Sequence, residues 1–309
     1  MPWGPVIQPL LERYPALRAV GNTPLVPVDL LRDELPEVRV SAKMESLNPG
    51  GSLKDRPVLR MVLAALAEGR LRPGQTLLDS SSGNAGIAYA MIGRIVGVPV
   101  EIVIPDNASL ERKKRLRAHG ARLVFTDAIL GYDEALREVH RRYRADPDRY
   151  FFCDQYANPD NWRTHYETTA EEILAQTDGR LTHVVVGVGT GGTLTGLGRR
   201  LKAHDPAIRL VCVVPDTFPG IEGLKPLGSP EDIVPVILDE GLIDERVPVS
   251  GDEAHAMCVR LAGAGFFVGQ SSGAYLAGVE RVARRERRGH FVTLFNDLGE
   301  RYFSTRLWD

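Results

Sequence analysis

Apolar positions along the chain follow two periodicities, one typical of buried strands and the other of helices. Three short runs, residues 98–105, 182–189 and 208–216, are almost entirely apolar. Such runs are typical of strands that are buried on both faces of a sheet. In residues 54–69, by contrast, the apolar side chains recur at a helical spacing. This spacing predicts a helix with a broad buried face, which Gly69 is expected to end.

The rest of the chain divides into further strands and helices that alternate. Strands are expected at residues 21–30, 38–47, 75–86 (where the strand runs into a turn), 121–127, 150–155 and 290–297. An opening helix is expected, and then helices at residues 87–97, 109–120, 132–146, 161–177, 190–204, 252–265 and from about 274. Apolar strands that alternate with helices predict an α/β fold, with parallel twisted sheets covered by helices in two lobes.

Composition and charge exclude several classes of protein. The chain has 309 residues with 43% hydrophobic and 25% charged side chains, and its net charge is -2. A balance so close to zero gives no general electrostatic attraction to nucleic acid or to a membrane surface. The basic runs 111–120 and 281–290 are interpreted as solvated helix faces.

The cysteines and the N-terminus indicate a cytoplasmic protein. Cys153, Cys212 and Cys258 are far apart and lack metal-type spacing, so free thiols and no metal site are expected, with Cys153 and Cys212 packed in the core. The N-terminus lacks a secretory pattern, and no apolar run approaches the ~20 residues of a membrane helix.

A glycine-rich turn follows the strand at 182–189. It reads Gly189-Thr190-Gly191-Gly192-Thr193 and opens the next helix. Free amides at a helix N-terminus bind phosphate, and the two hydroxyls suit a terminal phosphate monoester. The same run also fits a dinucleotide-binding pattern with Asp216 as the ribose ligand, so an NAD-dependent dehydrogenase is an alternative, and a purely structural turn is another.

Lys54 is the second chemical feature, within the sequence NPGGSLKDRP. The chain has 32 arginines and only six lysines, and Lys54 is the lysine expected to begin a helix after a glycine turn. The helix dipole disfavours a cation there and so favours the neutral, nucleophilic amine. The alternative is a plain surface charge. An amine nucleophile together with a phosphate cradle predicts pyridoxal 5'-phosphate, a phosphorylated aldehyde, as cofactor.

The ordered set NPGGSLKDRP, SSSGNAG, DQYANPDNW, GVGTGGTLTG, GQSSGA and DLGERYFST resembles the cysteine synthase family, which includes O-acetylserine and O-phosphoserine sulfhydrylases. The resemblance implies a two-lobed pyridoxal-phosphate enzyme of fold type II that catalyses β-replacement. It implies a larger cofactor-binding domain of residues 1–47 and 156–309. A smaller mobile domain, residues 48–155, is expected to close on the substrate.

The resemblance also implies residue roles. Lys54 matches the lysine that forms the imine with the cofactor and acts as general base, and residues 189–193 match the phosphate loop. Asn84 matches the ligand of the cofactor's ring hydroxyl, and Ser271 matches the serine that faces the pyridine nitrogen. The residues expected to bind the substrate carboxylate are Ser81, Ser82, Asn84 and Gln155. A neutral hydroxyl at the pyridine nitrogen does not keep the ring protonated.

The implied reaction joins an activated serine, O-acetylserine or O-phosphoserine, to a sulfur donor and yields L-cysteine. Cystathionine β-synthase and other β-substituted alanine synthases share these motifs and remain alternatives. Lys225 is a candidate determinant of the leaving group, and His165 is interpreted as a structural histidine. Family analogy predicts a homodimer.

Overall fold

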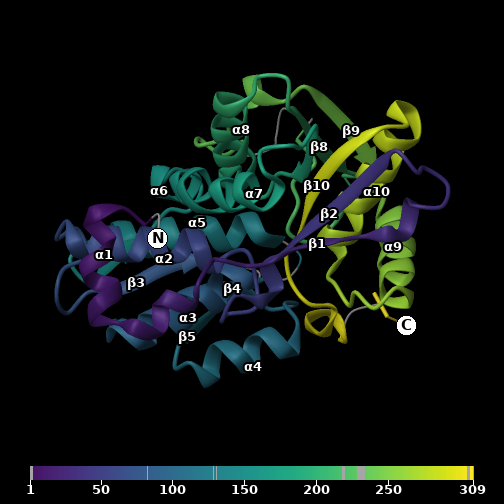
Figure 1. Ribbon diagram of the computed structural model, residues 1–309. Coiled ribbons are helices and arrows are strands. Elements are labelled where there is room, and N and C mark those ends of the chain that lie inside the picture. Colours follow the sequence, from purple (N-terminus) through teal and green to yellow (C-terminus); the bar gives the residue numbers. More distant parts are fainter. Residues whose placement is uncertain are drawn as a thin grey trace. The chain divides into compact units, whose positions relative to one another are not determined.

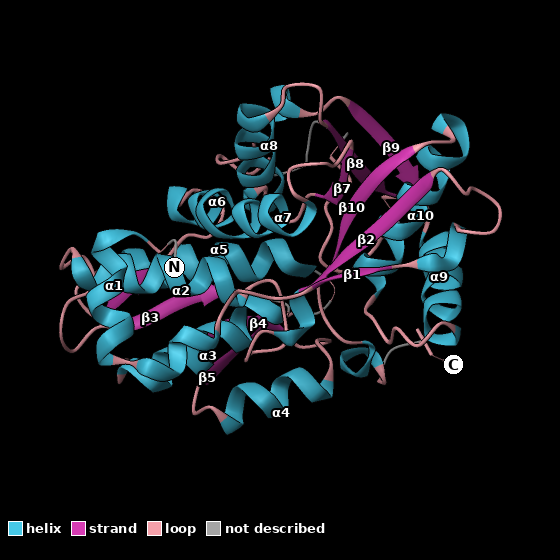
Figure 2. Ribbon diagram, viewed as in Figure 1, coloured by secondary structure: helices cyan, strands magenta, loops and turns pink. Residues whose placement is uncertain are grey.

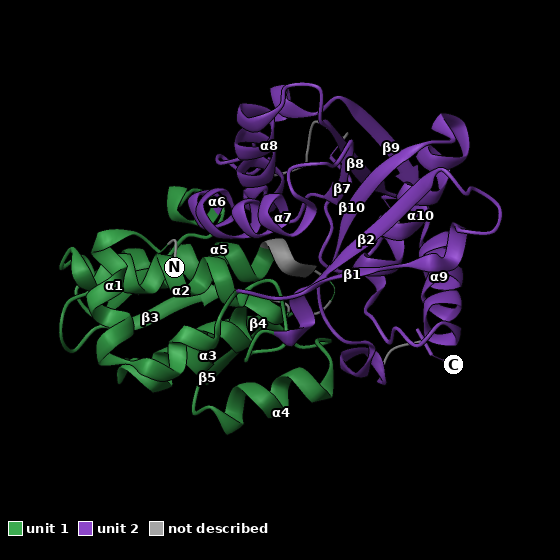
Figure 3. Cartoon of the chain, in the orientation of Figure 1, with its two compact units in different colours: residues 1–21, 48–161 green, residues 22–47, 162–309 purple. Residues whose placement is uncertain are grey.

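The computed structural model describes residues 3–81, 83–127, 129, 131–217, 220–227, 234–304 and 307–308. Helices and strands alternate along this chain (Figures 1 and 2). The chain forms two compact units, unit 1 with residues 1–21 and 48–161 and unit 2 with residues 22–47 and 162–309 (Figure 3, green and purple). Among the described helices, none is long and apolar enough to cross a membrane.

Unit 1 contains a parallel sheet of four strands in the order β5-β4-β3-β6. The strands are β3 (Thr76–Ser80), β4 (Val100–Pro105), β5 (Arg122–Thr126) and β6 (Tyr150–Phe152). The helices are α1 (Gly4–Arg13), α2 (Asp55–Ala67), α3 (Asn84–Val96), α4 (Leu110–Ala118), α5 (Gly131–Ala145) and α6 (Pro159–Thr164), of which α6 continues past the end of the unit.

Both faces of this sheet are covered, as the apolar runs predict. Leu77 and Ile102 belong to a core cluster that includes side chains of α1, α2 and α3. The neighbouring Leu78 and Val103 point to the opposite face and pack with Ala135 and other side chains of a second cluster. Side chains alternate between the two faces of a strand, so two apolar neighbours in sequence need two covering layers.

The N-terminal segment belongs to unit 1, which differs from the predicted domain boundaries. The sequence analysis placed residues 1–47 in the larger domain, whereas residues 1–21 group with residues 48–161. Trp3, Ile7 and Leu11 are almost fully buried in the core cluster that α2 and α3 share. Closure of residues 48–155 on a substrate stays a prediction.

Unit 2 contains a sheet of six strands in the order β1-β2-β10-β7-β8-β9. The strands are β1 (Leu25–Pro27), β2 (Val38–Met44), β7 (His183–Gly187), β8 (Arg209–Pro215), β9 (Glu245–Val249) and β10 (Gly289–Phe295). The α-helices that lie wholly within this unit are α7 (Ala170–Thr177), α8 (Gly192–His204), α9 (Gly251–Gly263) and α10 (Gln270–Glu286). A π-helical turn, His165–Thr169, connects α6 to α7.

The predicted parallel arrangement holds for every strand pair of this sheet except β1–β2, which is antiparallel. β9 was missed in the sequence because it has only five residues and includes Pro248. An edge strand tolerates a proline, because one side of its backbone makes no ladder. α10 begins at Gln270 rather than near residue 274, since its first turn consists of serines and glycine that are typical of loops.

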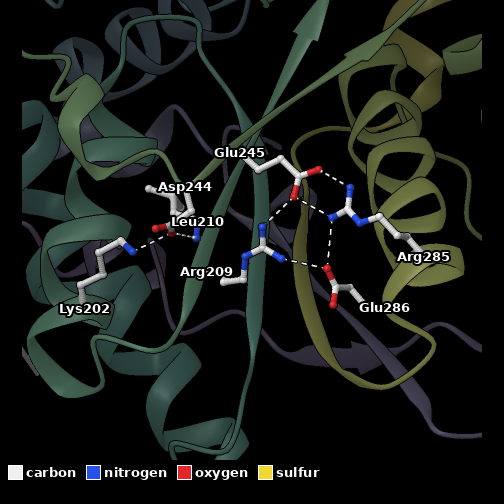
Figure 4. A network of polar contacts seen from close by, with 7 residues as sticks. All are labelled: Lys202, Arg209, Leu210, Asp244, Glu245, Arg285 and Glu286. Atoms are coloured by element: carbon white, nitrogen blue, oxygen red, sulfur yellow. Dashed lines mark hydrogen bonds and ion pairs between the residues drawn. The ribbon is translucent and has the colours of Figure 1, made fainter.

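Charged side chains gather at the edge of the unit 2 sheet where parallel strands begin. Arg209 starts β8 and bonds Glu245, which starts β9, and Glu286 at the end of α10, at 2.9 Å each (Figure 4). Arg285 bonds Glu245 as well, and Lys202 bonds Asp244 beside it. The glycine-rich turns lie at the opposite edge, where β7 and β10 end.

Candidate active site

Lys54 lies at the N-terminal end of α2, where the sequence placed it. It occupies the N-cap position with φ −68° and ψ −17°, and its side chain is half-buried. Its carbonyl accepts from Val58 N at 3.2 Å, which starts the helical ladder, and its own amide donates to Ser52 Oγ at 3.3 Å. The lysine is therefore held on a rigid element rather than on a free loop.

Asp55 organises the turn that precedes Lys54. Its buried carboxylate accepts a hydrogen bond from Gly50 N. A Cβ at Gly50 would lie 2.2 Å from Asp55 Oδ1, so this position has no room for a side chain. The carboxylate also sits in the first turn of α2, where the helix dipole favours negative charge. Glycine and aspartate together thus fix the loop in front of the lysine.

Ser81 follows β3 and holds the start of α3. Its Oγ accepts from Gly83 N at 3.1 Å and from Gly86 N at 2.8 Å. Both lone pairs of the hydroxyl are used in this way, so its hydrogen is what Ser81 can offer to a carboxylate. Asn84 is half-buried and is the first residue of α3. The predicted ligand Ser82 lies outside the described residues.

Gln155 lies close to the same loop in unit 1. Its Nε2 donates to Ser80 O at 2.9 Å, and its backbone carbonyl accepts from Asn161 Nδ2 at 2.7 Å. The side chain is 4% exposed. The structure therefore brings Ser81 and Gln155 together at the end of β3, just before Asn84 begins α3, and their binding of a substrate carboxylate stays a prediction.

Asp79 is a buried carboxyl group beneath this loop that the sequence analysis did not single out. Its Oδ1 accepts from Ser80 N at 2.7 Å, and a hydrogen bond of 2.6 Å joins its Oδ2 to the Tyr89 hydroxyl. Burial raises the pKa of Asp79 to about 7, although the bonds from Tyr89 and Ser80 oppose this shift. A carboxyl residue within the apolar strand at 75–80 was the signal in the sequence.

The glycine-rich turn of unit 2 leads from β7 into α8. Gly191 is the N-cap of α8 with φ +83°, a left-handed conformation that favours glycine, and no side chain caps this helix end. A Cβ at Gly189 would lie 2.6 Å from Gly223 O. The first-turn amides of α8 thus lie at a helix end that can receive an anion.

His165 has a closer relation to this turn than the sequence suggested. Its Nε2 lies 3.3 Å from Thr193 Oγ1, and its Nδ1 lies 2.9 Å from Thr169 Oγ1. The π-helical turn approaches α8 closely, because a Cβ at Gly196 would lie 2.3 Å from Trp162 O. The buried histidine therefore contacts a predicted phosphate-loop residue, and its interpretation as a structural histidine stays a prediction.

Ser271 lies in the first turn of α10, where the resemblance placed the partner of the pyridine nitrogen. Its Oγ accepts from Asn296 Nδ2 at 3.0 Å, and both side chains are more than 90% buried. The backbone amide of Lys225 donates to Val188 O at 2.7 Å, next to Gly189.

Comparison with known proteins identifies the family. Residues 16–297 match the family described as pyridoxal-phosphate dependent enzyme. A cysteine synthase of Aquifex aeolicus (strain VF5) is 46% identical over 304 residues, which cover 96% of this chain and 92% of the relative. The chain belongs to the cysteine synthase family. Cysteine synthase B of Pseudomonas aeruginosa is 38% identical over 299 residues and covers 96% of this chain and 98% of its own length.

Solved structures of cysteine synthase family members agree with this assignment. O-acetyl serine sulfhydrylase isoform 3 from Entamoeba histolytica superposes with a TM-score of 0.87 at 33% identity, covering 95% of this chain and 90% of that one. O-ureido-L-serine synthase superposes with a TM-score of 0.86 at 38% identity, covering 95% and 94%. The chain is thus a pyridoxal-phosphate-dependent enzyme of fold type II that catalyses β-replacement. The family match overturns the dehydrogenase alternative.

The residues present fit this cofactor. The start of α8 has no side-chain cap, and Gly189 and Gly191 have no room for a Cβ, which would lie 2.6 Å from Gly223 O and 2.9 Å from Leu238 Cβ. Asn296 Oδ1 is buried and has no hydrogen-bond partner in the described chain, as expected beside a group that binds there. The hydrogen-bond donors of these unit 2 residues are neutral hydroxyls and amides, which can bind a phosphate group and a pyridine nitrogen. Across the described residues, no group of His, Cys, Asp and Glu could hold a metal ion.

Proposed function

We propose that the chain is a cysteine synthase that replaces the β-substituent of an activated serine with a sulfur nucleophile to give L-cysteine. The activated serine is O-acetylserine or O-phosphoserine. The observation that carries this proposal is the uncapped start of α8 at Gly191, in a chain that also presents an amine, Lys54, at the start of α2. Similarity to enzymes named cysteine synthase and O-acetyl serine sulfhydrylase supports it.

Each candidate residue has one task in this reaction. Bound pyridoxal phosphate withdraws electrons from the amino acid attached to it, so that Cα loses a proton and the β-substituent leaves. The amine of Lys54 would hold the cofactor aldehyde, and once the amino group of the substrate has displaced it, the free amine would take the Cα proton and later return it. The amides of residues 191–193 and the Thr193 hydroxyl hold the phosphate.

The substrate carboxylate is bound in unit 1. The Ser81 hydroxyl hydrogen and the side-chain amides of Asn84 and Gln155 are its donors. Ser81 follows β3 and Asn84 begins α3, whereas Gln155 follows β6 and donates to Ser80 O. Hydrogen bonds to a charged acceptor are about twice as strong as neutral ones. This binding orients Cα and excludes water from it.

Borohydride reduction of the holoenzyme tests the role of Lys54. A pyridoxyl group is expected on Lys54, located by peptide mass spectrometry, and Lys54→Ala should lose both the tag and turnover. Lys114→Ala is the matched control, because Lys114 is exposed in the same unit. A tag on another side chain, or on none, contradicts the proposal.

A second candidate is a different β-substituted alanine synthase, because O-ureido-L-serine synthase superposes as well as the sulfhydrylase does. Steady-state rates with O-acetylserine and O-phosphoserine against sulfide, thiosulfate, homocysteine and hydroxyurea distinguish these enzymes. Fastest turnover with homocysteine would indicate a cystathionine β-synthase instead.

Lys225 is our candidate for selecting the leaving group. Its backbone is tied to Val188 O, which places the residue in the segment that borders the phosphate loop. Lys225→Ala should slow turnover of O-phosphoserine more than that of O-acetylserine, because a cation binds the phosphate leaving group. Equal losses with both donors contradict this role.

We also infer a cytoplasmic homodimer. Three buried thiols without disulfides fit a reducing compartment. The dimer follows from family analogy, and light scattering of the purified holoenzyme tests it.

A further inference from the structure

The end of β10 is tied to the first turn of α10 by one residue. Asn296 donates twice, from its backbone amide to Ser272 Oγ at 2.9 Å and from its side-chain Nδ2 to Ser271 Oγ at 3.0 Å. Asn296 and Ser271 are 7% and 6% exposed, and Ser272 is fully buried. Water therefore does not compete for these bonds, and their direction is set by protein groups.

The direction of the Asn296–Ser271 bond decides what Ser271 can offer. A hydroxyl has one hydrogen and two lone pairs. Since Nδ2 occupies one lone pair of Ser271 Oγ, the hydroxyl hydrogen points away from Asn296 and toward another acceptor. Ser271 is thereby prepared as a donor.

Tyr275 lies in the same helix, one turn after Ser271. Its hydroxyl donates to Gly187 O at 3.5 Å. The bond from Asn296 Nδ2 to Ser271 Oγ shows which end of the amide faces the serine. In the described part of the chain, Asn296 Oδ1 has no hydrogen-bond partner.

We propose that Asn296 is a positioning residue that fixes Ser271 as a hydrogen-bond donor to the cofactor's ring nitrogen and so holds that nitrogen unprotonated. This inference rests on the proposed function, in which Ser271 faces the pyridine ring. The first turn of α10 acts in the same sense, because the positive end of the helix dipole disfavours a proton there. The neighbouring carboxylate of Asp297 accepts from the Tyr302 hydroxyl at 2.9 Å.

Without Asn296 the Ser271 hydroxyl is free to rotate and can accept a hydrogen bond from a protonated ring. Asn296→Ala should therefore raise the proton affinity of the ring nitrogen roughly five- to tenfold, the equivalent of one hydrogen bond. The ring would then withdraw electrons more strongly, which alters the balance between departure of the β-substituent and side reactions.

The test is a double-mutant cycle read by nitrogen-15 NMR, on holoenzymes reconstituted with pyridoxal phosphate labelled at the ring nitrogen. Asn296→Ala should move the nitrogen resonance toward its protonated position across a pH titration. The same substitution in a Ser271→Ala background should have no further effect, because Asn296 acts through Ser271. Thr293→Val is the control, since it removes a buried hydrogen bond of β10, from Thr293 Oγ1 to Val185 O, that involves neither Ser271 nor Asn296, and its resonance should match wild type.

Each outcome is decisive. An unchanged resonance in Asn296→Ala, or an equal shift with and without the Ser271 hydroxyl, overturns the inference. Failure of wild type to form a borohydride-reducible bond at Lys54 overturns the proposed function instead. Should Asn296→Ala not fold, Asn296→Ser, which keeps a short donor, provides the same comparison and a smaller expected shift.

Discussion

The two units support their candidate site residues with different chemistry. In unit 1 a buried carboxyl group, Asp79, holds Ser80 at the root of the substrate loop and meets the Tyr89 hydroxyl. In unit 2 the hydroxyls of Thr193 and Ser271 meet an imidazole and an amide. The network of Figure 4 places several unit 2 carboxylates at the opposite edge of the sheet, paired with arginines.

This difference shows that environment, more than residue type, decides what a carboxyl group does. Burial raises the pKa of Asp79 to about 7. A hydrogen bond from Arg285 holds the pKa of Glu245 below its usual range, although partial burial opposes this shift. The first group is a neutral hydrogen-bonding element at mildly acidic pH, and the second remains an ion. A dianionic phosphate also binds better beside neutral donors than beside a carboxylate.

The largest expected effect comes from Asp79→Asn, which removes the titrating group from unit 1. In the folded state this carboxyl keeps its proton up to a pKa of about 7, whereas its ordinary value is 3.8. The folded state binds more protons between these values, so the stability from Asp79 is fully present below pH ~4 and is lost as pH rises through 7. The total is on the order of 4 kcal/mol.

Asn mimics the protonated carboxyl, since its amide can donate to Tyr89 while its oxygen accepts from Ser80 N. Asp79→Asn should therefore unfold at higher denaturant concentration than wild type at pH 8, and the difference should shrink toward pH 5. Denaturation curves across this range measure it. Asp148→Asn, on the surface of the same unit, is the control. A constant difference from pH 5 to 8 would show that Asp79 does not titrate.

The next largest effect is expected at Gly189, in the glycine-rich turn of unit 2 that is proposed to bind the cofactor phosphate. Gly189→Ala places a Cβ 2.6 Å from Gly223 O, a backbone atom that cannot move aside cheaply. Such overpacking costs about 1–3 kcal/mol, so affinity for pyridoxal phosphate should fall by about 10- to 100-fold. Absorbance titration of the apoprotein measures this.

Gly263→Ala is the control, because nothing lies within 4 Å of its Cβ position. It should bind the cofactor as wild type does and gain a little helix stability. Equal cofactor affinities in the two variants would mean that residues 189–193 do not bind the phosphate. The neutral donors of unit 2 would then have no role in binding the cofactor.

Much of this architecture could be predicted from the sequence, because glycines and apolar runs report local constraints. Lys54 at a helix start and the turn at 189–193 follow from short-range chemistry that neighbours in sequence determine. β9 could not be found in this way, since a short edge strand with Pro248 resembles a loop. The opening helix was predicted, but its place in unit 1 depends on burial of Trp3 and Ile7 against distant helices.

The supporting residues were missed for a related reason. Asn296 contacts Ser271 across 25 residues, and His165 contacts Thr193 across 28. Nothing local in either segment specifies the partner, because these contacts arise only when strand ends and helix starts pack together. Asp79 gave a signal as a carboxyl in an apolar strand, but its partner Tyr89 was hidden in a helix pattern.

A smaller effect is expected from Thr193→Val, which removes one neutral contact in unit 2. The change keeps the shape of the side chain but removes the hydrogen bond of 3.3 Å between Thr193 Oγ1 and His165 Nε2. Loss of one hydrogen bond of about 1 kcal/mol predicts roughly fivefold weaker binding of pyridoxal phosphate. Thr193→Ser should recover most of the affinity. Thr177→Val, whose hydroxyl bonds its own helix, should bind normally.

The smallest effect is expected from Arg285→Gln in the network of Figure 4. Its side chain is 53% exposed and bonds Glu245 at 2.7 Å and Glu286 at 3.1 Å. Exposed pairs contribute about 0.2–1 kcal/mol and are screened by salt, so the loss of stability should be small and should vanish near 1 M salt. The pKa of Glu245 is lowered, so this stability is lost as pH falls, opposite in sign to that of Asp79. Denaturation curves at two salt concentrations and at pH 4 and 7 measure how the free energy of unfolding depends on salt and on pH. A loss of stability that persists in high salt would show that these ion pairs are shielded from solvent as the Asp79 cluster is.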